Sequence, residues 1–248
     1  MPDKKTLLAV DYPTPEQWKL LIESFSPEAI AHKLLLASIP YVFRNEPLKF
    51  ALFRRTIADA FGVDATDVFI VGSALAGRSL KANELEQEYS PESDIDTLVI
   101  SEPLFTSHVM RSLEWVKEVT TPQWIKDSAG PQRSASQLVA PTLESDTVFQ
   151  IGRVAMHACR GIWRPDSLPK GASIREEFFD KFNDVSLKVL GLQLSEDTVA
   201  KVNGRIARSF GDAVADLAEN IRRLGNDLDY EATHGKKAAA TAKVQQVS

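Results

Sequence analysis

Cysteine is almost absent from this chain, since Cys159 is the only one among 248 residues. A single cysteine cannot form an internal disulfide, and no C-x-x-C motif or Cys/His cluster is present to build a cysteine-based zinc site. A disulfide framework and a zinc ribbon are therefore excluded. A reducing, cytoplasmic compartment fits this composition best.

Long apolar runs are absent as well. No stretch approaches the roughly 18 consecutive apolar residues of a membrane-spanning helix, and the start, MPDKKTLLAVDYPTPEQW, lacks a secretory apolar region with a cleavage site. We therefore expect a cytoplasmic protein without membrane partners. The net charge of −5 argues against a surface that wraps duplex nucleic acid, although it allows a local basic site.

The order of the predicted elements indicates an α+β protein that can bury its own core. Apolar runs at 67–72 and 95–100 predict two strands, each covered on both faces. Three helices precede them, and each begins where proline follows a helix-start residue, at Thr14-Pro15, Ser26-Pro27 and Glu46-Pro47.

Further elements are predicted between and beyond these strands. A helix over 74–80 and a polar loop over 81–93 separate them, and an amphipathic helix covers 107–119. Residues 120–145 are rich in Ser, Thr, Pro and Gln, which predicts an irregular segment. Apolar and β-branched residues from Phe149 to Trp163 predict one or two strands.

The C-terminal part is predicted to be helical. One helix starts near Ile174, and another is capped by Ser195 and runs through Val202 and Ile206 toward Leu224. The last residues, EATHGKKAAATAKVQQVS, lack bulky apolar side chains, which predicts disorder. We divide the chain into a helical segment over 1–46, a central domain over 47–170, a helical region over 171–230 and a disordered tail over 231–248.

Two short motifs carry most of the chemical information. Gly72-Ser73 follows the first strand, and Asp94-Ile95-Asp96 opens the second. Alternate side chains of a strand point to one face, so Asp94 and Asp96 project together, about 7 Å apart. Mg²⁺ prefers such carboxylate oxygens, and the N–H groups at a helix start favour phosphate.

Strand, Gly-Ser, helix, Ser-Asp-x-Asp and strand together resemble the nucleotidyltransferase superfamily. Its fold is shared by DNA polymerase beta, kanamycin nucleotidyltransferase and the minimal nucleotidyltransferases of toxin–antitoxin systems. The motif covers residues 68–101, and the phrase RGIWRPDSLP is similar to uncharacterised bacterial members. The resemblance implies a small mixed β-sheet with helices on one side, preceded by N-terminal helices and followed by a helical C-terminal region.

The resemblance also implies a chemistry. Members move a nucleoside monophosphate from a nucleoside triphosphate such as ATP to an acceptor and release pyrophosphate. By this resemblance Gly72 and Ser73 hold the phosphates, while Asp94 and Asp96 bind Mg²⁺ and are catalytic. The acceptor is left open, because a small molecule, an RNA end, a protein hydroxyl and a second nucleotide all fit.

The match departs from the family pattern in one respect. Active members often carry a third metal-binding carboxylate on a neighbouring strand, but the strand predicted over Val154–Trp163 contains no Asp or Glu. Asp146, just upstream with Glu144, is the candidate third metal ligand. The gap keeps an alternative open, a catalytically degenerate member that binds nucleotide or a protein partner. Such a partner could belong to a toxin–antitoxin or defence system.

Several other residues have both a functional and a structural interpretation. Arg78 and Lys81 lie about one and two turns into the predicted helix after Ser73, where they can reach phosphate, although solvated charges are commoner. A second basic set predicts either a wall for triphosphate or nucleic acid or, more often, separate surface ion pairs: Arg153, Arg160, Arg164 and Arg175.

Two nucleophile or metal interpretations are weak. His157 and Cys159 alternate on a predicted strand, but without further ligands a packed core pair is favoured over a metal site. Ser73 is not the nucleophile of a serine hydrolase, because GSALAG lacks the G-x-S-x-G spacing. Trp163 and the phenylalanines at 178, 179 and 182 are predicted core residues.

Overall fold

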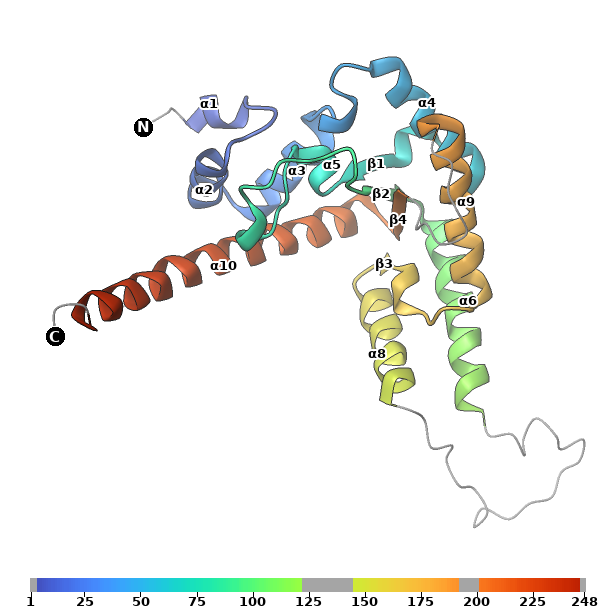
Figure 1. Ribbon diagram of the computed structural model, residues 1–248. Helices are drawn as coiled ribbons and strands as arrows, with labels where there is room; N and C mark the ends of the chain where they lie inside the picture. Colours follow the sequence, from blue (N-terminus) through green and yellow to red (C-terminus); the bar gives the residue numbers. More distant parts are fainter. Residues whose placement is uncertain (1–3, 122–144, 192–200, 246–248) are drawn as a thin grey trace, which may run out of the picture.

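The computed structural model describes residues 4–121, 145–191 and 201–245 (Figure 1). Within these ranges the chain is a mixed α+β protein with one small sheet. Both outer strands run antiparallel to their neighbours, and the two central strands are parallel. The order of the four strands is β1 (Val68–Val71), β2 (Ile95–Ile100), β4 (Val202–Ala207) and β3 (Ile162–Trp163).

The N-terminal helices form where the sequence predicts them. The Thr14 hydroxyl accepts a hydrogen bond from the Gln17 N–H, and the Gln17 side chain accepts one from the Thr14 N–H. Gly62 ends the third long helix with a left-handed φ of 68°. The elements of this part are α1 (Lys4–Leu8), α2 (Pro15–Ser24), α3 (Pro27–Ala37), the 3-10 turn η1 (Tyr41–Phe43) and α4 (Pro47–Phe61).

The helix after Gly72-Ser73 is shorter than predicted. It spans only Ser73–Ala76 (α5), because Gly77 takes a left-handed φ of 79° and ends it. Arg78 and Lys81 therefore belong to the loop that leads to β2, and the prediction that they lie on this helix is wrong. The other elements here are the 3-10 turns η2 (Ala65–Asp67) and η3 (Ala82–Glu84), and α6 (Glu102–Thr120).

The prediction of strands from Phe149 to Trp163 is wrong for most of that segment. Ser145–Cys159 forms helix α8, and only Ile162–Trp163 pairs as a strand. Val154 is buried while Ala155 and Met156 are exposed, which is the one-sided burial of a helix. The 3-10 turn η5 (Pro165–Ser167) follows, and α9 (Ser173–Leu190) confirms the helix predicted from Ile174.

The prediction of one continuous helix after Ser195 is also wrong. Ser195 lies outside the described residues, Val202–Ala207 form β4, and α10 (Phe210–Gln245) begins only at Phe210. α10 continues into the segment 231–248, for which composition predicts disorder. Among the helices described, none combines the length and apolar character needed to cross a bilayer.

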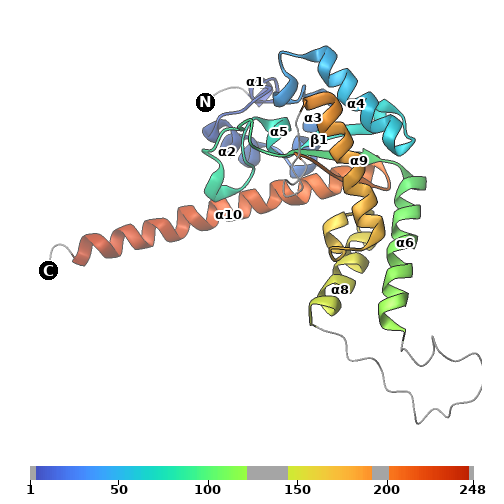
Figure 2. The same cartoon turned by 45° about the vertical axis from the view of Figure 1, so that its right-hand side comes forward.

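Helices cover both faces of the sheet, whereas the sequence predicts them on one side. α9 packs on the face of Gly204, where an added Cβ would lie 2.4 Å from the Phe182 ring. α10 packs on the opposite face, where Asp216 contacts Arg205, and Figures 1 and 2 show it on the other side of the sheet from α4. α10 is held there by an apolar stripe at helical spacing, Ala213, Leu217, Ile221 and Leu224.

Aromatic side chains fill the core between α4, α6 and α9. The Phe178 ring lies 4.8 Å from Trp163 and 5.0 Å from Phe182, measured between centroids. The buried Trp163 Nε1 donates a 2.8 Å hydrogen bond to Ser112 Oγ, which satisfies its polar atom. The core prediction is confirmed for Trp163, Phe178 and Phe182, and Phe179 is half-buried.

Close packing at Gly204 gives a first prediction. Gly204→Ala should lower the free energy of unfolding by about 1–3 kcal/mol, because the new methyl group would overlap Phe182 and the Thr97 hydroxyl. Urea unfolding followed by circular dichroism measures the change. The matched control is Gly152→Ala in α8, where a Cβ meets no atom within 4 Å and stability should rise by about 0.5–1 kcal/mol. Equal effects of the two substitutions would contradict this packing.

Candidate functional site

Asp94 and Asp96 lie on the same face at the start of β2. Asp96 pairs in register with Asn203 of the parallel strand β4, so these two side chains point to one side. Asp94 reaches the same side, because the Asn203 amide donates a 2.9 Å hydrogen bond to Asp94 Oδ2. The two carboxylates are thus presented together, on the face of the sheet that α10 crosses.

Gly72 brings the turn after β1 against Asp96. Its backbone, with φ 68° and ψ −149°, is a conformation that side chains disfavour, and an added Cβ would lie 3.1 Å from Asp96 Oδ2. Ser73 begins α5 directly after it. The first N–H groups of a helix have no partner inside the helix. The Asp96 carboxylate and the N–H groups at the start of α5 therefore lie close together.

These residues open into a cleft of about 670 Å³. Asp96, Gly72 and Ser73 line its floor, and Asp94 lies at its edge, outside the lining. One wall is the loop between α5 and β2, and the other comes from β4, the residue after β3, and α10. The lining residues used below are Lys81, Glu88, Tyr89, Arg164, Arg205, Asn220, Arg223 and Asp227. The volume suits a nucleotide-sized ligand.

Both carboxylates lie in surroundings that disfavour their negative charge. Burial and the charge of Asp96 raise the pKa of Asp94, although Lys201 and Asn203 act in the opposite direction. Burial also raises the pKa of Asp96, with a partial offset from nearby arginines. Two carboxylates held close together at such a cost are suited to binding a cation.

β4 supplies no third carboxylate beside this pair. On the aspartate face it carries Asn203, opposite Asp96, and Arg205, opposite Leu98. Within the described residues, no group of three or more His, Cys, Asp or Glu side chains is arranged to hold a metal. Asp146 is exposed in the first turn of α8, at the end away from the sheet in Figure 1, and does not line the cleft.

Of the two basic residues predicted to reach phosphate, Arg78 and Lys81, only Lys81 lines the cleft. Arg78 Nη1 donates a 3.0 Å hydrogen bond to the Leu85 carbonyl, which braces the loop, and Arg78 does not line the cleft. Lys81 does line it, is exposed, and forms an ion pair with Glu84 at 3.0 Å. Lys81 is therefore free to exchange Glu84 for an anionic ligand at little cost.

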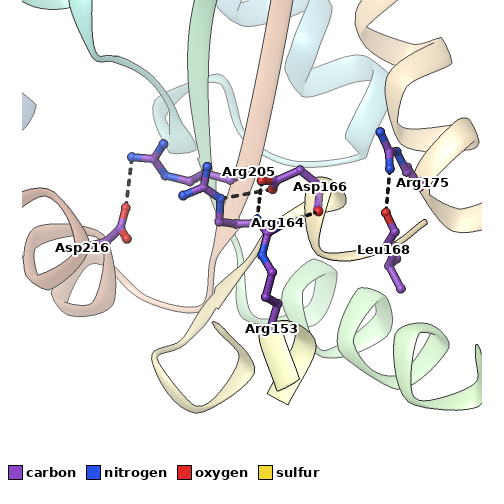
Figure 3. Close-up of polar contacts among 7 residues, drawn as sticks. All are labelled: Arg153, Arg164, Asp166, Leu168, Arg175, Arg205 and Asp216. Carbon is purple, nitrogen blue, oxygen red and sulfur yellow. Dashed lines mark hydrogen bonds and ion pairs between the residues drawn. The ribbon is translucent and has the colours of Figure 1, made fainter. Parts of the chain in front are cut away.

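The arginines do not form a continuous basic wall (Figure 3). Arg153 and Arg164 both bind Asp166, at 2.6 and 3.2 Å, and Arg175 donates to the Leu168 carbonyl at 2.6 Å. Only Arg164 of this set lines the cleft. The expectation of separate ion pairs is therefore met only in part: Arg153 and Arg164 share one carboxylate, and Arg175 binds a backbone carbonyl. Arg164 also belongs to the site.

His157 and Cys159 do not form a packed core pair. Both lie in the last turn of α8, two positions apart, so a helix directs them to different faces. Cys159 is exposed, and His157 is half-buried, with a pKa lowered by burial and by nearby arginines. The core prediction is wrong because it depended on a strand in this segment.

Three residues of the site were missed by sequence reasoning, namely Asn203, Arg205 and Tyr89. Tyr89 lines the cleft, and burial together with the charges of Asp94 and Asp96 raises the pKa of its hydroxyl. Asn203 and Arg205 alternate with small or apolar residues in VNGRIA. That two-residue period indicates a strand with one polar face, and it is the sequence signal from which Asn203 and Arg205 could have been identified.

Comparison with known proteins gives no match, whether with protein-family models, curated proteins or solved structures. No assignment can therefore be transferred to this chain from a relative.

The raised pKa of Asp96 gives a second prediction. A carboxyl whose pKa is higher in the folded than in the unfolded protein contributes stability at low pH and loses it as the pH rises through the folded pKa. Asp96→Asn should therefore be more stable than the wild type at about pH 7, and the difference should narrow toward about pH 4. Urea unfolding at several pH values, without metal, measures it.

Asp166→Asn is the control with the opposite sign. Although burial acts to raise it, the pKa of Asp166 is lowered by the charges of Arg164 and Arg153. Its substitution should destabilise the protein at about pH 7, and the loss should shrink as the pH falls through the native pKa. If Asp96→Asn also destabilised the protein at about pH 7, the described surroundings of Asp96 would be wrong.

Proposed function

We propose that this protein is a Mg²⁺-dependent nucleotidyltransferase that moves a nucleoside monophosphate from a nucleoside triphosphate to a hydroxyl acceptor. The observation that carries the proposal is the close approach of Gly72 to Asp96. A Cβ added at Gly72 would lie 3.1 Å from Asp96 Oδ2. This approach brings the carboxylate of Asp96, with Asp94 beside it at the edge, to a helix start in one cleft. A metal-bound triphosphate needs both kinds of group at once.

The order of the elements supports the same fold assignment. A strand, the Gly72-Ser73 turn, a short helix, a loop and a strand that opens on Asp94 and Asp96 follow one another, and the two strands pair. This is the arrangement that the resemblance to nucleotidyltransferases implies. The shortness of α5 leaves the turn and the first strand pair unchanged.

The residues present fit a divalent cation. Asp94 and Asp96 offer carboxylate oxygens, and burial raises the pKa of both, although Lys201 acts against it at Asp94, and Arg205 and Arg164 at Asp96. Asn203 fixes Asp94 through its amide, so the carboxylate is oriented before any ligand arrives. When bound, Mg²⁺ would neutralise charge on the phosphates and lower the pKa of the attacking hydroxyl.

The chain's own residues offer groups that can bind the triphosphate. Ser73 and the N–H groups after Gly72 can donate hydrogen bonds to phosphate oxygens at the floor of the cleft. Lys81 adds a positive charge from the loop. The loop and α10 lie on two sides of the cleft.

One observation favours a second function. On the strand beside Asp94 and Asp96, Asn203 offers an amide where a carboxylate would give the metal site three acidic ligands. With two carboxylates in place of three, the protein would bind a metal nucleotide without turning it over. It would then act as a nucleotide-dependent binding partner for another protein, as in a toxin–antitoxin or defence system. Turnover with any acceptor, lost on substitution of Asp94 and Asp96, would exclude this function.

The aspartate pair gives a third prediction. In isothermal titration of each nucleoside triphosphate with Mg²⁺, combined Asp94→Asn and Asp96→Asn substitutions should weaken binding at least about tenfold, because the carboxylate ligands of the metal are lost. The matched control combines Glu88→Gln and Asp227→Asn, which remove two other carboxylates of the cleft. The control should leave the affinity within about threefold of the wild type.

Two results would contradict the proposed site. One is equal loss of binding in both double variants, which would show a general effect of charge. The other is triphosphate binding by the wild type that does not depend on Mg²⁺. Retained folding of both variants is checked by circular dichroism and by their unfolding midpoints.

Asn203 gives a fourth prediction. Asn203→Asp should raise the affinity for Mn²⁺, measured by electron paramagnetic resonance, about tenfold or more, because it adds a carboxylate beside Asp94 and Asp96. Without metal the same variant should be less stable, since three like charges then face one another. Asn220→Asp, on α10 in the same cleft, is the control and should change neither property much. Unchanged Mn²⁺ affinity in Asn203→Asp would contradict a metal site at this pair.

A further inference from the structure

The two walls of the cleft lie on opposite sides of the aspartate pair. β2 carries Asp96, β1 with its Gly72-Ser73 turn lies on one side of it, and β4 and β3 lie on the other. The phosphate donors of the proposed function are therefore confined to the β1 side. Arg205 and Arg164 line the cleft on the β4 and β3 side.

Arg205 has hydrogen-bonding capacity that the protein leaves unused. Its Nη2 lies 3.0 Å from Asp216 Oδ2, close enough for an ion pair but without the alignment of a hydrogen bond. Its Nε is buried and has no hydrogen-bond partner within the described part of the chain. A guanidinium group has five N–H donors, so Arg205 can bind an anion in the cleft while it keeps Asp216.

Arg164 shares its carboxylate with a second arginine. Asp166 binds both Arg153, at 2.6 Å, and Arg164, at 3.2 Å, so one negative charge serves two positive ones (Figure 3). Arg153, Arg164 and Arg205 are thus paired with only two carboxylates, Asp166 and Asp216, which leaves one excess positive charge. The charges of Arg205 and Arg164 also lower the pKa of Asp96. Metal binding at Asp96 would leave that charge available to a ligand.

In-line phosphoryl transfer separates the two reactants in space. The attacking and leaving oxygens lie on opposite sides of the transferred phosphorus. With the leaving pyrophosphate near Gly72 and Ser73, the acceptor approaches from the side of β4 and β3. The acceptor is then the substrate that meets Arg164 and Arg205.

We propose that Arg164 and Arg205 form an anion subsite for the acceptor, and that the acceptor carries a phosphate group near its reacting hydroxyl. The inference rests on the proposed function and narrows its substrate class. In the step itself, the acceptor oxygen forms a bond to the α-phosphorus, and the bond from that phosphorus to the bridging oxygen breaks. The electron pair leaves with pyrophosphate, and the hydroxyl proton passes to solvent.

The subsite is tested with the donor position filled. Wild-type protein is saturated with Mg²⁺ and the non-hydrolysable α,β-methylene ATP, and inorganic phosphate, AMP and adenosine are then titrated in turn. Phosphate should bind, and AMP should bind at least about tenfold more tightly than adenosine, because a paired guanidinium group contributes one or more charge-assisted hydrogen bonds.

Arg164→Ala should weaken phosphate and AMP binding at least about tenfold, and leave the affinity for the ATP analogue unchanged. Arg153→Ala is the matched control, because Arg153 binds the same Asp166 but does not line the cleft. It should leave the affinity for the ATP analogue unchanged and weaken phosphate and AMP binding by less than Arg164→Ala does, because it removes one charge of the cluster but no group that lines the cleft. The combination Arg205→Gln with Asp216→Asn tests the second arginine without leaving a buried carboxylate unpaired, and should also weaken phosphate binding.

Three results would overturn the inference. They are no phosphate or AMP binding to the filled wild type, equal losses in Arg164→Ala and Arg153→Ala, and loss of ATP-analogue binding in Arg164→Ala, which would assign the arginines to the donor. Failure of the wild type to bind the analogue would instead contradict the proposed function. Phosphate is therefore also titrated into wild type and Arg164→Ala without Mg²⁺ or the analogue. A loss of phosphate affinity in Arg164→Ala then supports the subsite even if the analogue does not bind.

Discussion

The contact between Gly72 and Asp96 is the constraint on which the site depends. The left-handed φ of 68° favours glycine, and a Cβ added at Gly72 would lie only 3.1 Å from Asp96 Oδ2, so glycine lets the turn after β1 approach the carboxylate of β2 closely. The pairing of Val71 with Asp96 fixes the register that makes the contact. The position of the Asp96 carboxylate therefore depends on both the strand pairing and the turn. A shift of the pairing register by one residue would turn Asp96 toward α9.

The same unit is costly for the fold. Burial raises the pKa of both Asp94 and Asp96, so their charged forms reduce stability near neutral pH. β4 compensates in part, through the Asn203 amide on Asp94 and the charge of Arg205 near Asp96. A cleft that keeps unfavourable charges together with partial compensation has the electrostatics expected of a binding site.

Much of the first half of the chain could be predicted from local signals. Thr14 and Pro15 start a helix by a capping box, Gly62 ends another, and the two buried strands stand out as apolar runs. β4 could not be recognised in the same way. Val199, Val202 and Ile206 recur at helical spacing, and this signal obscured the alternation of Asn203 and Arg205. A strand whose partner is about a hundred residues earlier is specified by that partner, not by its neighbours.

The most direct test of the account is a crystal structure of the protein with Mg²⁺ and a non-hydrolysable nucleoside triphosphate. We expect a metal ion bound by oxygens of Asp94 and Asp96, with the β- and γ-phosphates against Ser73. A triphosphate bound elsewhere, or a cleft in which Asp94 and Asp96 contact no metal, would contradict it.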